Sequence, residues 1–266
     1  MSFRPVVPFG GFAGWSFLSR TREAQQAAFE QSPSIERGLA YFKENIGKAT
    51  TAEALVSDRR LLSVALGAFG LGGDLENRYF IRKVLEEGTR GDDALANRLA
   101  DKRYRALSRA FGFGDSPVPN TARSGFADKI GAMYQDRRFE IAVGQQAPDM
   151  RLALNLTREL KPLAADDSTE ATKWFTVMGS PPLRKVFETA LGLPSSFGAL
   201  DIERQLGMFR EKAAQVFGDD TIAQFAEPAR QDELLRLFLA RSQIADGVDS
   251  IGSARTALTL LQNAAR

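Results

Sequence analysis

The sequence of 266 residues contains no cysteine and no histidine. Without cysteine, disulfide bonds, thiolate nucleophiles, zinc fingers and iron–sulfur clusters are excluded. Without histidine, the usual general base, the Ser-His-Asp triad and the commonest transition-metal ligand are excluded as well. An enzyme would have to work with Asp, Glu, Lys, Arg, Tyr or Ser. We therefore predict a non-enzymatic protein with no catalytic residue, no cofactor and no metal centre.

The sequence also lacks a strong excess of one charge and any long apolar run. The net charge is +2 and the isoelectric point is about 8.9, which is too mild a balance to indicate nucleic-acid or membrane binding. No apolar run approaches the ~20 residues that cross a bilayer, and the first residues make a poor secretory signal. The hydrophobic fraction of 44% is typical of a folded soluble protein. The expected location is the cytoplasm.

Strands are not indicated, because no segment combines β-branched residues with a period of two. Spacings of three and four, which predict an amphipathic helix, occur in the series Ile35, Leu39, Phe42 and Ile46. Thr50 with Glu53 is typical of a capping box, and Asp58 is typical of an N-cap. The expected fold class is all-α, an irregular multi-helix bundle.

Three predicted helices end in the same signature: an alanine, a large apolar residue, a glycine and another large apolar residue. A glycine just past the last turn can adopt the left-handed conformation, and the apolar residue after it can fold back on the helix. We predict structural helix stops at Gly70 and Leu71, at Gly112 and Phe113, and at Gly192 and Leu193.

One of these helix corners has a counterpart later in the chain. Residues 61–85 align without a gap with residues 183–207, and each segment reads as a helix, a glycine stop and a second helix. Two interpretations stay open. The chain consists of two related helical halves, or the segments look alike because helix stops look alike.

Composition suggests how the chain is organised. Residues 1–18 are rich in glycine, proline and aromatic residues, which predicts a flexible arm. Helical halves are expected over 19–115 and 126–244, separated by the linker-like stretch 115–125 and joined in one continuous globular unit. Residues 245–266 are expected to form a tail with a short amphipathic helix.

Candidate partner surfaces lie in the arm and in the tail. The arm offers aromatic side chains at Phe12, Trp15 and Phe17. The tail has apolar residues at spacings of three, four and three, namely Ile251, Ala254, Leu258 and Leu261. This heptad-like seam is too short to stand alone as a coiled coil, which favours a contact with something else.

Two further functions are alternatives. A nucleic-acid binder would use a weak basic face formed by Arg98, Lys102, Arg105 and Arg109. The near-neutral net charge favours a solvated helix face there, paired with local acids such as Asp101. An enzyme or small-molecule sensor would use an acid/Lys/Arg site between the two helical halves.

Several stretches, in this order and at these separations, resemble one known family. They are FLSRTREAQQAAFEQSP (17–33), YFKENIGK (41–48), DRRLLSVALGAFGL (58–71), FIRKVLEEGT (80–89), LANRLADKRYRALSRAFGF (95–113) and ALGLPSSFGALDIERQ (190–205). The family is an alphaproteobacterial family of helical proteins, domain of unknown function 1217, often encoded in flagellar gene clusters. The resemblance covers residues 17 to about 240 and implies no catalytic or binding residue.

The functional hypothesis combines this resemblance with the composition. The resemblance implies a role in flagellar assembly or regulation, and the lack of histidine and cysteine favours action through protein–protein contacts. The expected partner is a flagellar protein. Flagellar export substrates lack cleaved signals, so export is the alternative to the cytoplasm.

Overall fold

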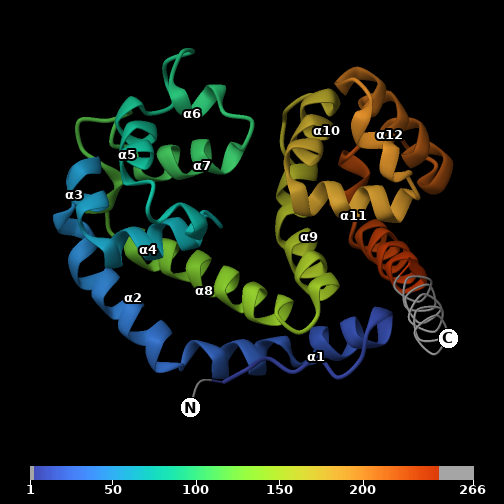
Figure 1. Cartoon of the computed structure of the whole chain (residues 1–266), viewed down its shortest axis with the longest axis horizontal. Coiled ribbons are helices and arrows are strands. Elements are labelled where there is room, and N and C mark those ends of the chain that lie inside the picture. Colours follow the sequence, from blue (N-terminus) through green and yellow to red (C-terminus); the bar gives the residue numbers. More distant parts are fainter. Residues whose placement is uncertain (1–2, 246–266) are drawn as a thin grey trace, which may run out of the picture. The chain divides into compact units, whose positions relative to one another are not determined.

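The structure, a computed structural model, describes residues 3–245 (Figure 1). These residues form helices joined by turns and short 3₁₀ segments, and they contain no strand. The predicted all-α class is confirmed. Contacts divide the chain into two units. Unit 1 comprises Arg20–Gln146 and the start of the chain up to Val6, and unit 2 comprises Val7–Ser19 and the chain from Ala147 onward.

Helix α1 (Gly11–Glu30) contains the boundary between the units, and the other elements of unit 1 follow in chain order. Its α-helices are α2 (Pro33–Asn45), α3 (Ala52–Ser57), α4 (Arg59–Ala68), α5 (Arg78–Glu87), α6 (Leu95–Arg98), α7 (Lys102–Phe111) and α8 (Phe126–Gly144). Its 3₁₀ segments are η1 (Ile46–Lys48), η2 (Gly72–Asp74) and η3 (Asn120–Ala122).

Helix α4 lies at the centre of unit 1, because α2, α3 and α8 all pack against it. Its buried residues therefore occupy most of its circumference: Leu61, Leu62, Val64, Ala65, Leu66 and Ala68. Edge-to-face packing of Phe111 and Phe126, with ring centroids 5.1 Å apart, brings α7 and α8 into the same core. The sequence stripe of α2 supplies buried Ile35 and Phe42.

The N-caps in this region follow the predicted chemistry, with one shift of register. Asp58 Oδ1 accepts hydrogen bonds from the amides of Arg60 and Leu61, at 2.9 and 3.1 Å, at the start of α4. At α3 the cap is Thr51, whose Oγ1 accepts from the Ala54 amide, and not the predicted Thr50. Neighbouring threonines offer the same hydroxyl, so only the backbone geometry selects between them.

The stretch 115–125, predicted as a linker, is an ordered part of unit 1. Buried Thr121 donates its hydroxyl to the Ala49 carbonyl at 2.9 Å, and η3 packs against η1. Helix α8 then packs against α4 and α2, so its residues group with the first part of the chain. The division between the units consequently falls after Gln146 and not within the predicted linker.

Unit 2 contains the remaining helices. They are α9 (Pro148–Ala164), α10 (Glu170–Gly179), α11 (Pro181–Leu191), α12 (Ile202–Phe217) and a helix over residues 228–245, which we call the 228–245 helix. Two 3₁₀ segments connect them, η4 (Ser195–Ala199) and η5 (Ala223–Ala226).

An aromatic cluster forms the core of unit 2. Trp174 stacks on Phe209 and meets the edge of Phe187, with ring centroids 5.5 Å apart in both pairs. Phe225 continues the cluster at 5.4 Å from Phe187. The Trp174 indole N–H donates to the Asp220 carbonyl at 2.9 Å, so the buried polar atom of the ring is satisfied.

The predicted arm over residues 1–18 is not an arm where the structure describes it. Helix α1 begins at Gly11, and Leu18 is fully buried. Before this helix, the Val6 amide donates to Gln25 Oε1 at 2.6 Å, and Gln25 Nε2 donates back to the Val6 carbonyl at 3.1 Å. Composition favoured a mobile segment, but contacts with residues later in the chain fix it.

Two of the three glycine stops have the hydrogen bonds of a Schellman motif. At the end of α4, the Leu71 amide donates to the Leu66 carbonyl at 2.8 Å, and Gly70 has a φ of +72°. At the end of α11, the Leu193 amide donates to the Glu188 carbonyl at 2.9 Å, and Gly192 has a φ of +66°. Each glycine therefore occupies the left-handed region that other residues avoid.

The stop at Gly112 is of a different type. Its φ is +70°, but its own amide donates to the Ser108 carbonyl at 2.8 Å, the single bond of the αL motif. Phe113 lies beside Phe111, with ring centroids 5.8 Å apart. The three similar sequences thus end helices in two ways.

All three stops share a feature that the sequence did not indicate. A side chain from another segment donates to the carbonyl of the alanine two residues before the glycine. The pairs are Arg137 Nε to Ala68 at 3.1 Å, Asn120 Nδ2 to Ala110 at 2.9 Å, and Arg241 Nη1 to Ala190 at 2.7 Å. A Cβ on each glycine would lie within 3.0 Å of the same donating side chain. Each glycine therefore permits both the turn and the approach of the donor.

Candidate functional site

Tyr41 and Asp58 form a polar cluster with altered acidity in unit 1. The Tyr41 hydroxyl donates to Asp58 Oδ2 at 2.6 Å, and this hydrogen bond, with burial, raises the pKa of Tyr41. Burial acts to raise the pKa of Asp58, but the hydrogen bonds from Tyr41 and from the amides of Leu61 and Arg60 outweigh it and hold that pKa below its usual value. The carboxylate therefore caps α4 and ties it to α2, and it is not poised to accept a proton.

Tyr104 is a second tyrosine with altered acidity. Burial and the hydrogen bond to Asp74 Oδ2, 2.8 Å long, raise its pKa to about 12. The edge-to-face contact with Phe80, at 5.2 Å between centroids, covers the ring. A phenol of this pKa stays neutral near pH 7 and is a poor general base there. The group joins α7 to η2.

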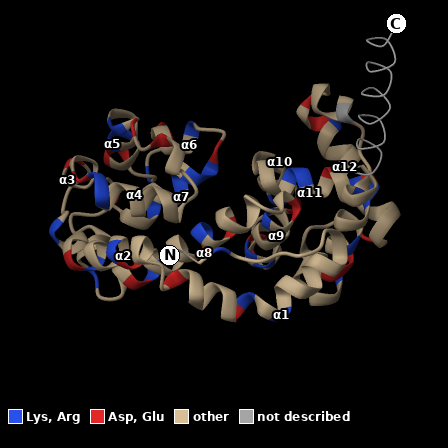
Figure 2. Ribbon diagram, turned by 60° about the horizontal axis from the view of Figure 1, so that its bottom comes forward, with Lys and Arg blue, Asp and Glu red and all other residues tan. Residues whose placement is uncertain are grey.

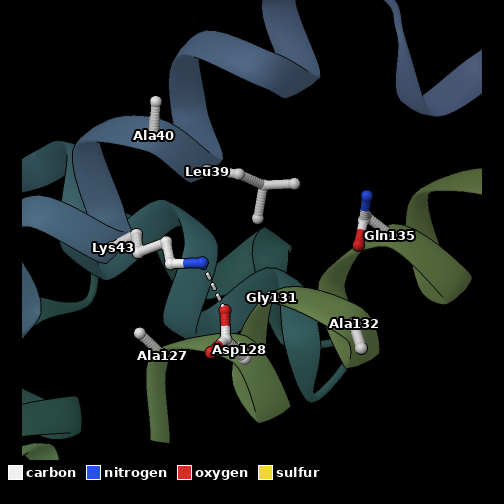
Figure 3. Close-up of a pocket in the computed structure, with 8 residues that line it drawn as sticks. All are labelled: Leu39, Ala40, Lys43, Ala127, Asp128, Gly131, Ala132 and Gln135. Atoms are coloured by element: carbon white, nitrogen blue, oxygen red, sulfur yellow. Dashed lines mark ion pairs between the residues drawn. The ribbon is translucent and has the colours of Figure 1, made fainter. Parts of the chain in front are cut away.

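A pocket of about 220 Å³ lies between α2 and α8 in unit 1 (Figure 3). Half of its lining residues are small, namely Ala40, Ala127, Gly131 and Ala132. Lys43 Nζ and Asp128 Oδ1 form an ion pair of 2.6 Å across it, and both side chains are about two-thirds exposed. Water screens such a pair, so the pocket lacks the desolvated acid and base that proton transfer uses. The described residues hold no group of three side chains suited to a metal ion.

The predicted basic face is partly used inside unit 1. Lys102 donates to the Leu99 and Asn97 carbonyls at 2.9 and 3.3 Å, and so neutralises the carboxyl end of α6. The three arginines of the face are exposed and make no ion pair with described residues: Arg98, Arg105 and Arg109. Figure 2 shows basic and acidic residues interspersed along the ribbon. The expected pairing with Asp101 is made by Arg103, at 2.6 Å.

Large apolar side chains of unit 2 are exposed near the start of α1 and in the 228–245 helix. Phe9 is 59% exposed, Phe12 is 44% exposed and Ile244 is 67% exposed. We call these three residues the apolar surface of unit 2. Exposed large apolar side chains that gather in one place are typical of binding surfaces.

Two contacts bring the two segments of this surface together. The Arg236 guanidinium of the 228–245 helix lies 4.9 Å from the centroid of the Phe12 ring. Gly11, with a φ of +57°, lies so close to this helix that a Cβ there would overlap the Gln243 amide. The first turn of α1 and the 228–245 helix therefore pack together and hold Phe12 at the surface.

The structure separates the predicted partner residues. Phe12 is exposed, whereas Trp15 and Phe17 are half-buried in α1. Ile251, Leu258 and Leu261 lie outside the described residues. Sequence reasoning missed Ile244, although it stands seven residues before Ile251, the spacing that joins positions of one heptad seam.

Comparisons with known proteins place the chain in a family. No curated protein matches it. The crystal structure of protein AGR_C_984 from Agrobacterium tumefaciens is similar, with a TM-score of 0.74 and 22% identity over 91% of this chain and 99% of that one. This likeness shows a shared fold. None of the described helices has the length and apolarity to cross a bilayer. A family model matches residues 68–230, more than half of the sequence, and the chain therefore belongs to the family described as "Protein of unknown function (DUF1217)".

Proposed function

We propose that the protein is non-enzymatic and binds another protein through the apolar surface of unit 2. The observation that carries this proposal is the exposure of Phe12 and Ile244 on two helices that pack together, and of Phe9 just before the first of them. Burying a phenylalanine or isoleucine side chain in an interface contributes about 1.5–3 kcal/mol. Three such residues on a fixed scaffold can supply the centre of a small interface.

Rigidity supports the binding role. The packing of Gly11 against Gln243 and of Phe12 under Arg236 fixes the backbone that presents the aromatic rings. A side chain on a fixed backbone loses less conformational entropy on binding than one on a mobile arm. The surface lies outside the family match at 68–230.

We propose flagellar assembly or regulation as the setting, with a flagellar protein as partner. The support for this setting is the resemblance of the sequence stretches quoted above to proteins encoded in flagellar gene clusters. Location in the cytoplasm and export with the flagellum are two forms of the same proposal. Cell fractionation distinguishes them, because the exported form would be recovered with hook–basal bodies.

Capture of the partner from motile cells tests the binding surface. The bait is the full chain, compared with a variant carrying Phe9→Glu and Phe12→Glu. A matched control is Val118→Glu, which alters an apolar residue of unit 1 that is also exposed. A partner that is retained by the chain and by the control, is lost with the double variant, and rebinds as a purified protein supports the proposal. Equal capture by all three baits contradicts it.

Deletion of the gene tests the setting separately. The proposal expects impaired swimming that the intact gene restores and that the double variant does not restore. Normal flagella and normal swimming after a clean deletion would remove the flagellar setting, and the binding surface would still be tested by the capture experiment.

A further inference from the structure

A short stretch before α1 is held in unit 1 in the way that a binding site holds a peptide. The Gln25 side chain contacts both polar groups of the Val6 backbone: its Oε1 accepts from the amide at 2.6 Å, and its Nε2 donates to the carbonyl at 3.1 Å. The Pro5 carbonyl accepts from Gln146 Nε2 at 2.7 Å. Two consecutive residues are therefore held through their backbone by glutamine side chains.

The two glutamines stand on a packed scaffold. Gln25 lies in the second half of α1, and Gln146 follows the end of α8 by two residues. The rings of Phe29 and Phe139 join these helices edge to face, with centroids 5.9 Å apart. Gln25 is only 8% exposed, and its Nε2 also donates to Thr21 Oγ1 at 2.8 Å, which orients the amide. The amide thus presents one acceptor and one donor in a fixed direction.

Burial along the stretch indicates what the site selects. Pro5 is buried, and a proline has no amide that burial would leave unpaired. The Val6 side chain is 52% exposed, so the site holds the backbone of this residue and not its side chain. Arg4 and Pro8 are exposed. The contacts therefore fit a non-helical segment in which a proline precedes any residue that keeps its backbone amide.

We propose that Gln25, Gln146 and the surface that buries Pro5 form a peptide-binding site, and that residues 3–8 are its resident occupant. The external ligand is an exposed, non-helical segment of a partner protein in which a proline precedes a residue other than proline. The site lies in unit 1 and shares no residue with the apolar surface of unit 2. It is a second binding site, additional to the proposed function.

The resident segment can leave without the loss of a helix. Residues 3–8 belong to no helix, and side chains supply the hydrogen bonds that hold Pro5 and Val6. The segment can therefore detach while the helices keep their own backbone hydrogen bonds. A segment joined to its site by a short linker acts at an effective concentration of about 1 mM. Because the segment is docked, a free peptide of the same sequence should bind the emptied site with a Kd below about 1 mM.

Binding of such a peptide to the full chain tests the site. The probe is a fluorescently labelled peptide, FRPVVPF, with the sequence of residues 3–9. The chain carries Pro5→Asp, which expels the resident segment because burial of an unpaired carboxylate is unfavourable. Fluorescence polarisation should show saturable binding with a Kd below about 1 mM. The matched control is Pro8→Asp at an exposed proline, which keeps the site occupied and should bind the probe roughly tenfold more weakly.

Two further changes test the recognition itself. In the chain with Pro5→Asp, adding Gln25→Leu should weaken probe binding by roughly tenfold, because leucine offers neither of the two hydrogen bonds. A probe with proline in place of Val6, FRPPVPF, should lose a similar factor, because it lacks the amide that donates to Gln25. Circular dichroism of each variant controls for loss of the fold.

The unaltered chain gives a measurement that needs no substitution. Unlabelled FRPVVPF at about 1 mM should raise the hydrogen-exchange rate of the Val6 amide at least about twofold, because the peptide traps molecules whose own segment has left the site. Equal probe affinity for all the variants, no saturable binding up to about 1 mM, or an unchanged Val6 exchange rate overturns the proposal. A dimer of the unaltered chain that the peptide dissociates would make a second copy the occupant, and overturns a partner protein as the ligand.

Discussion

Replacing Gly192 with alanine should destabilise unit 2 by about 2.5–4 kcal/mol. Gly192 has a φ of +66°, and alanine there costs about 1 kcal/mol in backbone strain. The new Cβ would also lie 2.6 Å from Arg241 Nη1, which donates to the carbonyl of buried Ala190 at 2.7 Å. Displacing the guanidinium leaves that carbonyl without its charged donor, at a cost of roughly 1.5–3 kcal/mol.

The matched control is Gly218→Ala. Gly218 has a φ of +79° at the end of α12, but an added Cβ would meet no atom within 4 Å. It should therefore cost only the strain, about 1 kcal/mol. In a chain that also carries Arg241→Ala, the Gly192→Ala substitution should cost no more than this control, because the donor has already been removed.

Urea unfolding followed by tryptophan fluorescence measures these differences. Both tryptophans of the chain, Trp15 and Trp174, belong to unit 2, so the signal reports on that unit. The reasoning is refuted if Gly192→Ala and Gly218→Ala lower the free energy of unfolding equally in the chain that retains Arg241. Arg241 would then adapt to the methyl group without losing its hydrogen bond.

Three further predictions concern charged and polar groups. Because folding lowers the pKa of Asp58, its charge should stabilise the protein above pH ~5 and cease to do so as the carboxylate is protonated below pH ~4. The difference in stability between the protein and Asp58→Asn, followed by circular dichroism, should therefore shrink as the pH falls through this range, and a constant difference contradicts the prediction. Tyr104, with its pKa raised to about 12, should stabilise the fold fully below pH ~10 and lose this effect as the pH rises further. Ultraviolet titration should show an ionisation at a pH of about 12 that disappears in Tyr104→Phe, and an unchanged titration curve refutes the assignment. Buried Lys173 donates to the Ala164 carbonyl at 3.0 Å and pairs with Glu170 at 3.2 Å, so Lys173→Met should lower the free energy of unfolding in urea by about 3 kcal/mol. The control Lys185→Met, at an exposed lysine, should lower it by less than about 0.5 kcal/mol, and equal losses would show that the contacts of Lys173 contribute no stability.

Local chemistry explains which parts of the fold could be predicted. The apolar stripe of α2 and the cap at Asp58 depend on residues a few positions apart, and both signals can be read from the sequence. The left-handed glycines at Gly70 and Gly192 are equally local. The helical class follows from such signals alone, since each acts within one turn or one corner.

Contacts between distant residues explain what could not be predicted. The pair of hydrogen bonds between Val6 and Gln25 fixes a segment whose composition suggested mobility. The packing of α8 on α4 assigns α8 to unit 1, although the preceding stretch 115–125 reads as a linker. A single sequence contains no signal for such pairings.

The candidate site shows the same limit. Aromatic residues near the start of the chain attracted attention to Phe12, which the structure exposes. The sequence did not indicate that Arg236 and Gln243 lie beside that turn, so Ile244 was not grouped with Phe12. The donors that accompany the helix stops were missed for the same reason.

The composition of unit 2 from two separate parts of the chain has a consequence for biosynthesis. A ribosome makes Val7–Ser19 long before it makes the 228–245 helix, against which Gly11 and Phe12 pack. Unit 1 has most of its residues in one run, so it can fold while translation continues. The first turn of α1 cannot complete its packing until the late helix emerges. Unit 2 therefore completes its packing only after the 228–245 helix has been synthesised.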